Sequence, residues 1–165
     1  MISINLQGGL GNQLFQIFAT IAYAIQHNHK FIFPYSDKIM QRVTYWNNFL
    51  SVLKMFTTAN LIHRFSNNDI NHMETYGELD FKYNEIPPRN KSDNFKLSGY
   101  FQSYKYFEKY QHQIYALLRL DKQMESIKNE VSELFNTSTT ISMHFRLGDY
   151  KNLQGFHPIM PPALS

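Results

Sequence analysis

The sequence predicts an α/β protein built on a parallel sheet. Residues 2–6 alternate between apolar and polar, which is typical of a strand, and three glycines follow within four residues. A long apolar run over residues 14–25 then has helical spacing, and residues 31–33, closed by Pro34, predict a second strand. Strand, glycine turn, helix and strand, in this order, form the opening unit of a parallel α/β sheet.

The helix of this unit is expected to be buried on nearly all sides. Apolar residues occur all round the run over residues 14–25, so that little polar surface remains for solvent. The helix should end near His27 and Asn28. We expect residues 13–26 to pack against the parallel sheet of a three-layer α/β sandwich.

The rest of the chain has weaker signals. Residues 66–94 are polar, rich in Asn and contain two adjacent prolines, so loops and short elements are expected there. Helices are expected over residues 46–56, 104–118 and 121–135, and strands over residues 61–65, 96–101 and 139–145.

Composition excludes several classes of function. A net charge of +3 without a run of like charges does not favour a nucleic-acid partner. The chain has no cysteine, which excludes disulfides and thiolate metal sites. No basic segment precedes the first apolar run, as a signal peptide requires, and this run is shorter than the ~20 residues of a membrane span. We expect a cytoplasmic protein, with peripheral association with a membrane as the alternative.

The glycine turn does not match either common nucleotide-binding motif. The dinucleotide motif lacks its third glycine, and no Gly-Lys-Ser/Thr sequence follows Gly11. Glycines still allow a ligand to approach the backbone, and a helix N-terminus presents free N–H groups to an anion. A tight turn without a ligand explains the spacing equally well, so the spacing alone leaves both interpretations open.

A second candidate site lies at the end of the strand predicted over residues 139–145. Alternation places His144 and Arg146 on one face, and Asp149 follows a turn at Gly148. The planar fork of an arginine, with a neighbouring histidine, suits a phosphate or diphosphate. The alternative is an ion pair between Arg146 and Asp149 that stabilises a loop and binds no ligand. No Asp-x-Asp pair or histidine cluster at metal spacing occurs, so we expect no metal site.

Three motifs together point to a known family. They are GGLGNQLFQ at residues 8–16, GYFQSYKYF at residues 99–107 and HFRLGDY at residues 144–150. In sequence, order and approximate spacing they resemble the α-1,2-fucosyltransferases of glycosyltransferase family 11. The resemblance spans most of the chain, apart from an Asn-rich region over residues 34–95.

The resemblance implies transfer of L-fucose from GDP-fucose to a galactoside hydroxyl, often O2 of galactose, with inversion and without a metal or cofactor. It implies a GT-B-like architecture, with a Rossmann-like acceptor-side domain over residues 1–136 and the start of a GDP-fucose-binding domain over residues 137–165. Arg146 would grip the diphosphate, His144 would assist, and Asp149 would orient Arg146 or the sugar. The loop that faces the donor across the cleft would consist of Gly8, Gly9, Gly11, Asn12 and Gln13.

The chain departs from the family pattern in length. Fifteen residues follow Tyr150, where the family continues through its donor-binding half. We therefore expect an amino-terminal half with the first strand of a truncated second half, inactive on its own. It is a truncated gene product, a fragment, or one part of a split enzyme whose second chain supplies the missing half. A non-catalytic α/β module that binds a glycan or a partner is the alternative.

Overall fold

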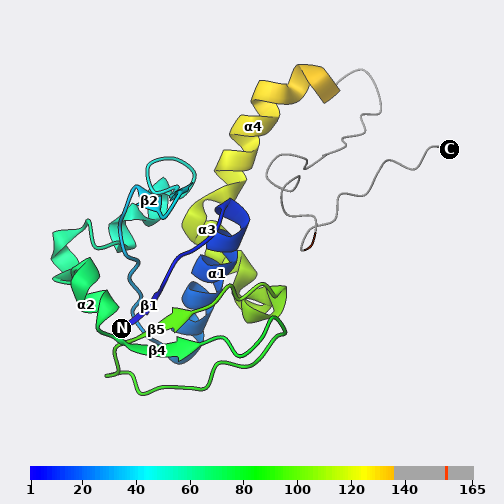
Figure 1. The fold of residues 1–165 in the computed structure, drawn as a ribbon. Helices are drawn as coiled ribbons and strands as arrows, with labels where there is room; N and C mark the ends of the chain where they lie inside the picture. Colours follow the sequence, from blue (N-terminus) through cyan, green and yellow to red (C-terminus); the bar gives the residue numbers. More distant parts are fainter. Residues whose placement is uncertain (136–154, 156–165) are drawn as a thin grey trace. The chain divides into compact units, whose positions relative to one another are not determined.

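The structure, a computed structural model, describes residues 1–135 and Gly155. Met1–Glu125 forms one compact unit of mixed α/β structure, as the sequence predicts (Figure 1). At its centre lies a parallel sheet in the order β1–β5–β4, formed by Ile2–Ile4, Phe95–Ser98 and Glu74–Gly77.

The predicted second strand lies beside β1 as an extended segment. Phe31 forms a parallel bridge with Ile2, and the N–H of Ile32 donates to the carbonyl of Ile2 over 3.0 Å. Phe33 makes a further parallel bridge, with Thr57. The predicted order of strand, turn, helix and parallel segment is therefore confirmed, although the last segment pairs through single bridges.

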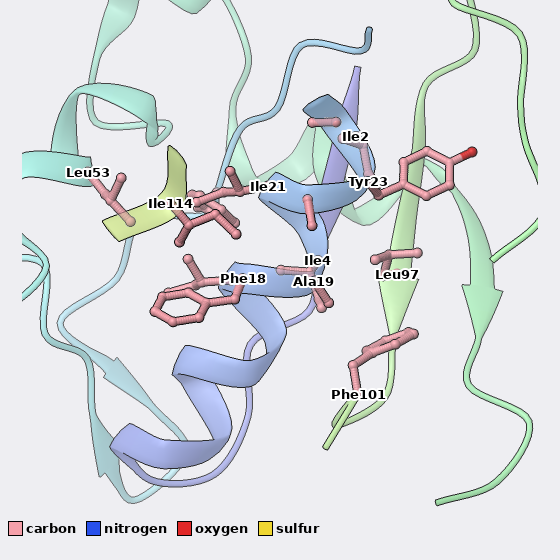
Figure 2. Close-up of a cluster of buried hydrophobic side chains, with 14 of the residues drawn as sticks. Ile2, Ile4, Phe18, Ala19, Ile21, Tyr23, Leu53, Leu97, Phe101 and Ile114 are labelled. Atoms are coloured by element: carbon pink, nitrogen blue, oxygen red, sulfur yellow. The ribbon is translucent and has the colours of Figure 1, made fainter. Parts of the chain in front are cut away.

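Helix α1, Leu10–His27, covers one face of the sheet. Ile2 lies opposite Phe95 in the ladder, and Ile4 lies opposite Leu97. These side chains are almost fully buried and belong to one cluster with the apolar residues of α1 (Figure 2). Each Å² of apolar surface buried in this way contributes roughly 25 cal/mol, so this cluster stabilises the unit.

The expected burial of α1 is confirmed over most of its length. Residues 16–24 are all buried, whereas Ile25 and Gln26 are exposed. The helix ends at His27, as predicted, because Asn28 adopts a left-handed conformation with φ of 55°. Its N–H bonds to carbonyls of the last helical turn, which completes the C-cap.

The opposite face of the sheet is covered by the short helix α2, Asn67–Asn71. Ile32 packs there with Ile70 in a second apolar cluster. Lys96, which lies on the same face, donates from Nζ to the carbonyl of Asn71 over 2.7 Å. Within the described residues, this layer is much smaller than the helical layer of the three-layer sandwich that we expected.

The prediction of a strand over residues 61–65 is wrong. Leu61–His63 is a 3₁₀ helix, and the side chain of Asn60 caps it by accepting a hydrogen bond from the N–H of Ile62. Leu61 and Ile62 are 86% and 84% exposed. Consecutive apolar residues therefore mark an exposed turn here, not a buried strand.

Two predicted helices form only in part. Of the helix expected over residues 46–56, a 3₁₀ helix forms at Ser51–Phe56. The helix expected over residues 104–118 begins as 3₁₀ turns and becomes α-helical only at α3, Gln111–Leu118.

The region expected to hold loops and short elements contains α2 and also β4, whose Glu, Thr and Tyr residues gave no strand signal. A short hairpin of β2, Lys38–Ile39, and β3, Arg42–Val43, was not predicted. The last predicted helix is confirmed as α4, Leu120–Phe135. The strand predicted over residues 139–145 and the domain boundary at 136 and 137 lie outside the described residues.

Candidate functional site

The segments that follow β1 and β5 leave the sheet at the same edge, because the two strands are parallel. The segment over residues 8–13 follows β1, and the segment over residues 99–102 follows β5. We call these two segments together the glycine edge. Ligands of open α/β sheets bind outside the carboxyl ends of the strands, which makes this edge a candidate binding site.

The two segments of the glycine edge are joined by a hydrogen bond. Nε2 of Gln102 donates to Oδ1 of Asn12 over 2.7 Å, between positions 90 residues apart in the chain. Asn12 lies in the first turn of α1, and Gln102 lies four residues beyond the end of β5. The first two motifs of the sequence therefore meet at one place.

The side chain of Gln13 holds the glycine turn through two hydrogen bonds. Its side chain is fully buried, and Nε2 donates to the carbonyl of Gly8 over 3.0 Å and to the carbonyl of Val43 over 2.9 Å. The β2–β3 hairpin is thereby tied to the turn. Oε1 of Gln13 is buried and has no hydrogen-bond partner within the described part of the chain.

The side chain of Gln16 holds the residue before the glycine turn, also through two hydrogen bonds. Its Oε1 accepts from the N–H of Gln7 over 2.9 Å, and its Nε2 donates to the carbonyl of Gln7 over 3.2 Å. Because both backbone groups of one loop residue are satisfied by one buried amide, the loop ahead of the glycines is held in a single conformation. The turn is thus a preformed structure.

The glycines of the turn differ in what they require. Gly8 has φ of +78°, and a Cβ there would lie 2.3 Å from Nδ2 of Asn12, so a larger residue does not fit. Gly9 and Gly11 have no positive φ, and no heavy atom of the described residues comes within 4 Å of a Cβ built on either. Of the three glycines in this turn, only Gly8 is required by the fold, whereas the space beside Gly9 and Gly11 is open.

The start of α1 is electropositive. No acidic residue lies in its first turn, and Gly9 at the N-cap has no side chain to bond the free N–H groups. The N–H groups ahead of Gln13 have no intrahelical acceptor, and the helix dipole adds a partial positive charge at this end. The open space beside Gly9 and Gly11 therefore lies next to N–H groups that have no acceptor within the helix.

A hollow of about 360 Å³ lies at the carboxyl end of β1 and of the segment beside it. The volume falls in the range of small-molecule sites. Polar groups are contributed by Asn5, Ser36 and Lys38, with Asn71 from α2. A small polar ligand with a negative or hydroxyl group would find donors and acceptors there.

The structure describes five of the eight predicted site residues. Gly8, Gly9, Gly11, Asn12 and Gln13 all lie in the glycine edge. His144, Arg146 and Asp149 lie outside the described residues, so their positions stay predictions.

The sequence analysis missed Gln102 in the glycine edge and Glu78, which contacts the edge. Gln102 lies within the motif at residues 99–107, which is a signal that was available. Glu78 gave none: its Oε2 accepts from the N–H of Tyr100 over 2.7 Å, and a Cβ on Gly99 would lie 2.4 Å from the Cβ of Glu78.

Among residues 1–135, no group of three or more His, Asp or Glu side chains is placed to hold a metal ion. In the same part of the chain, no helix has both the length and the apolar character needed to cross a membrane. Comparisons with known protein families, with curated proteins and with solved structures found no match to the chain.

Proposed function

We propose that this chain forms the acceptor-side part of an inverting α-1,2-fucosyltransferase that uses GDP-fucose as donor and a galactoside as acceptor. The observation that carries the proposal is the hydrogen bond from Gln102 to Asn12. It brings together two of the three motifs on which the family resemblance depends. Motifs that are distant in the chain and adjacent in space at a strand end are typical of a shared ligand site.

The glycine edge supports a role facing the donor. GDP-fucose carries a negatively charged diphosphate, and such groups are favoured at the N-terminus of a helix. The open space beside Gly9 and Gly11 lets substrate atoms come close to the backbone. The buried amides of Gln13 and Gln16 keep this surface in place before the substrate arrives.

The remaining chemistry is assigned to the third motif. In the proposal, Arg146 stabilises the charge that builds on the departing GDP, His144 assists, and Asp149 orients Arg146 or the sugar. Residues 137–165 then belong to the donor-binding domain. No metal takes part.

The test is a transfer assay with radiolabelled GDP-fucose and a panel of galactosides. It is run with the 165-residue protein alone and with the product of any adjacent downstream reading frame. The proposal predicts α-linked fucose on O2 of a terminal galactose when both halves are present. Binding of a galactoside without any transfer, in both arrangements, would favour the non-catalytic glycan-binding module.

A further inference from the structure

A second pocket lies at the other end of α1 from the glycine edge. It has a volume of about 150 Å³ and is walled by the last turns of α1, the segment before β5 and the 3₁₀ turns over residues 104–110. Four tyrosines line it: Tyr23, Tyr83, Tyr106 and Tyr110. The volume is below that of drug-sized sites, so that one six-membered ring fits better than a nucleotide.

The walls of this pocket are fixed by tyrosine hydroxyls. The hydroxyl of Tyr23, which points away from α1 (Figure 2), donates to the carbonyl of Pro87 over 2.9 Å and accepts from the N–H of Arg89 over 3.0 Å. The hydroxyl of Tyr106 accepts from the N–H of Asn84 over 3.2 Å. The segment over residues 84–89 is therefore held at two points, and the pocket is formed in advance of a ligand.

Two of the aromatic rings present a stacking surface. Tyr83 and Tyr106 lie with ring centroids 4.9 Å apart at an angle of 57°, and Tyr83 remains 42% exposed. A tyrosine with this much exposed surface can offer part of its ring to the apolar face of a sugar. Gln26 and Glu85 add an amide and a carboxylate at the rim, which suit sugar hydroxyls.

The charges at the rim favour an anion. Lys105 and Lys109 both line the pocket and are exposed, and neither forms an ion pair with a carboxylate of the described residues. His27 adds little charge at neutral pH, because burial, and then the neighbouring His29, lower its pKa. Two lysines against the single carboxylate of Glu85 leave one positive charge in excess.

From these groups we propose that the pocket binds an acidic monosaccharide, with the ring against Tyr83 and the carboxylate between Lys105 and Lys109. The site is separate from the glycine edge and does not depend on the proposed transferase activity. It gives the protein a contact with acidic glycans that is distinct from the galactoside acceptor.

The proposal is tested by isothermal titration of the 165-residue protein with methyl glucuronide, with neutral methyl glucoside and with inorganic phosphate. We expect the glucuronide to bind at least about tenfold more tightly than either of the others, because a charge-assisted hydrogen bond adds to the stacking. The difference should shrink in 1 M salt, where the Debye length is about 3 Å. Equal binding of glucuronide and glucoside, or no binding of the glucuronide, would overturn the proposal, and so would phosphate binding as tightly as the glucuronide.

Matched variants locate the site. Lys105→Gln with Lys109→Gln should weaken glucuronide binding about tenfold or more and leave the weak binding of the glucoside unchanged. Tyr83→Ala should weaken the binding of both sugars. The controls are Lys91→Gln and Tyr104→Ala, which change an exposed lysine and an exposed tyrosine that do not line the pocket. If the controls lower affinity as much as the pocket variants, the sugar binds elsewhere and the assignment is wrong.

Discussion

Nε2 of Gln102 lies 2.7 Å from Oδ1 of Asn12, and this hydrogen bond closes the glycine edge between two segments 90 residues apart. Asn12 is half-buried and Gln102 is exposed, so the bond lies at the surface of the unit. Its position at the carboxyl ends of β1 and β5 ties the start of α1 to the segment that leaves the sheet. Whatever binds at this edge meets both motifs at once.

We expect the energetic link between these two side chains to be measurable. Asn12→Ala and Gln102→Ala should each lower the free energy of unfolding by about 0.5–1.5 kcal/mol, since each removes the same hydrogen bond. The double variant should lose less than the sum, with a coupling of at least about 0.5 kcal/mol in urea denaturation. The control is Asn12→Ala with Gln113→Ala, an exposed glutamine on α3, which should be additive. Additivity for Asn12 and Gln102 as well would mean that the bond does not hold in solution.

The glycines of the turn should respond in opposite directions to alanine. Gly8→Ala should lower the free energy of unfolding by about 1–3 kcal/mol, because φ is +78° and the new Cβ meets Asn12. Gly11→Ala should leave stability unchanged or raise it by up to about 1 kcal/mol, because alanine is the better helix former and the space is open. Thermal and urea unfolding of the two variants check this. A loss in Gly11→Ala as large as that in Gly8→Ala would contradict the open space described here.

Stability should fall as the pH drops below neutral, in part through His27. Its pKa is lowered in the folded state, chiefly by burial and also by His29, while Glu85 opposes the shift. The folded state then binds fewer protons than the unfolded state, so the contribution is present above a pH of about 6.5 and is lost as pH falls through the lowered pKa. His27→Gln should flatten the decrease in urea midpoint between pH 7.5 and pH 5.5. His112→Gln, at an exposed position on α3, is the control, and an equal effect of both variants would rule out the assignment to His27.

The third motif provides a prediction on activity. Arg146→Ala in a transferring enzyme should lower the turnover rate by at least about 100-fold, because a preformed charge stabiliser contributes roughly 3 kcal/mol to the transition state. Arg146→Lys should also be poor, since a single ammonium does not replace the planar fork. Steady-state transfer of labelled fucose measures both variants. Near-normal rates in the alanine variant would mean that Arg146 only ties a loop.

The fold was predictable where local pattern and burial agree. The alternation over residues 2–6 and the apolar run over residues 14–25 are buried as β1 and α1, because a strand and a helix with these periods place apolar residues on the core. The same reasoning failed at Leu61 and Ile62, which are apolar but exposed. β4 was missed because, among the strands of residues 1–135, it pairs with β5 alone, and it has mostly polar residues with little burial.

The site was predictable in part for a similar reason. The three glycines stand out in the sequence as a group, and the structure shows that Gly8 is the one whose positive φ requires glycine. The partnership of Asn12 with Gln102 has no local signal, since it depends on the order of strands in the sheet. The roles of His144 and Arg146 rest on the alternation of residues 139–145, on the chemistry of the two side chains and on the family resemblance.

The central claim is that the open side of the glycine edge faces the substrates of fucosyl transfer, and Gly11→Ala tests it most directly. The measurement is the transfer rate, at saturating GDP-fucose, of a transferring enzyme that carries this variant, with Gly77→Ala as the matched control, because a Cβ on Gly77 also meets no described atom. We predict that Gly11→Ala lowers the rate at least about tenfold while its stability is kept or raised, since a methyl group displaces the reacting groups from their alignment. The Gly77→Ala variant should transfer at the unmodified rate. Equal rates for Gly11→Ala and the unmodified protein would contradict the claim.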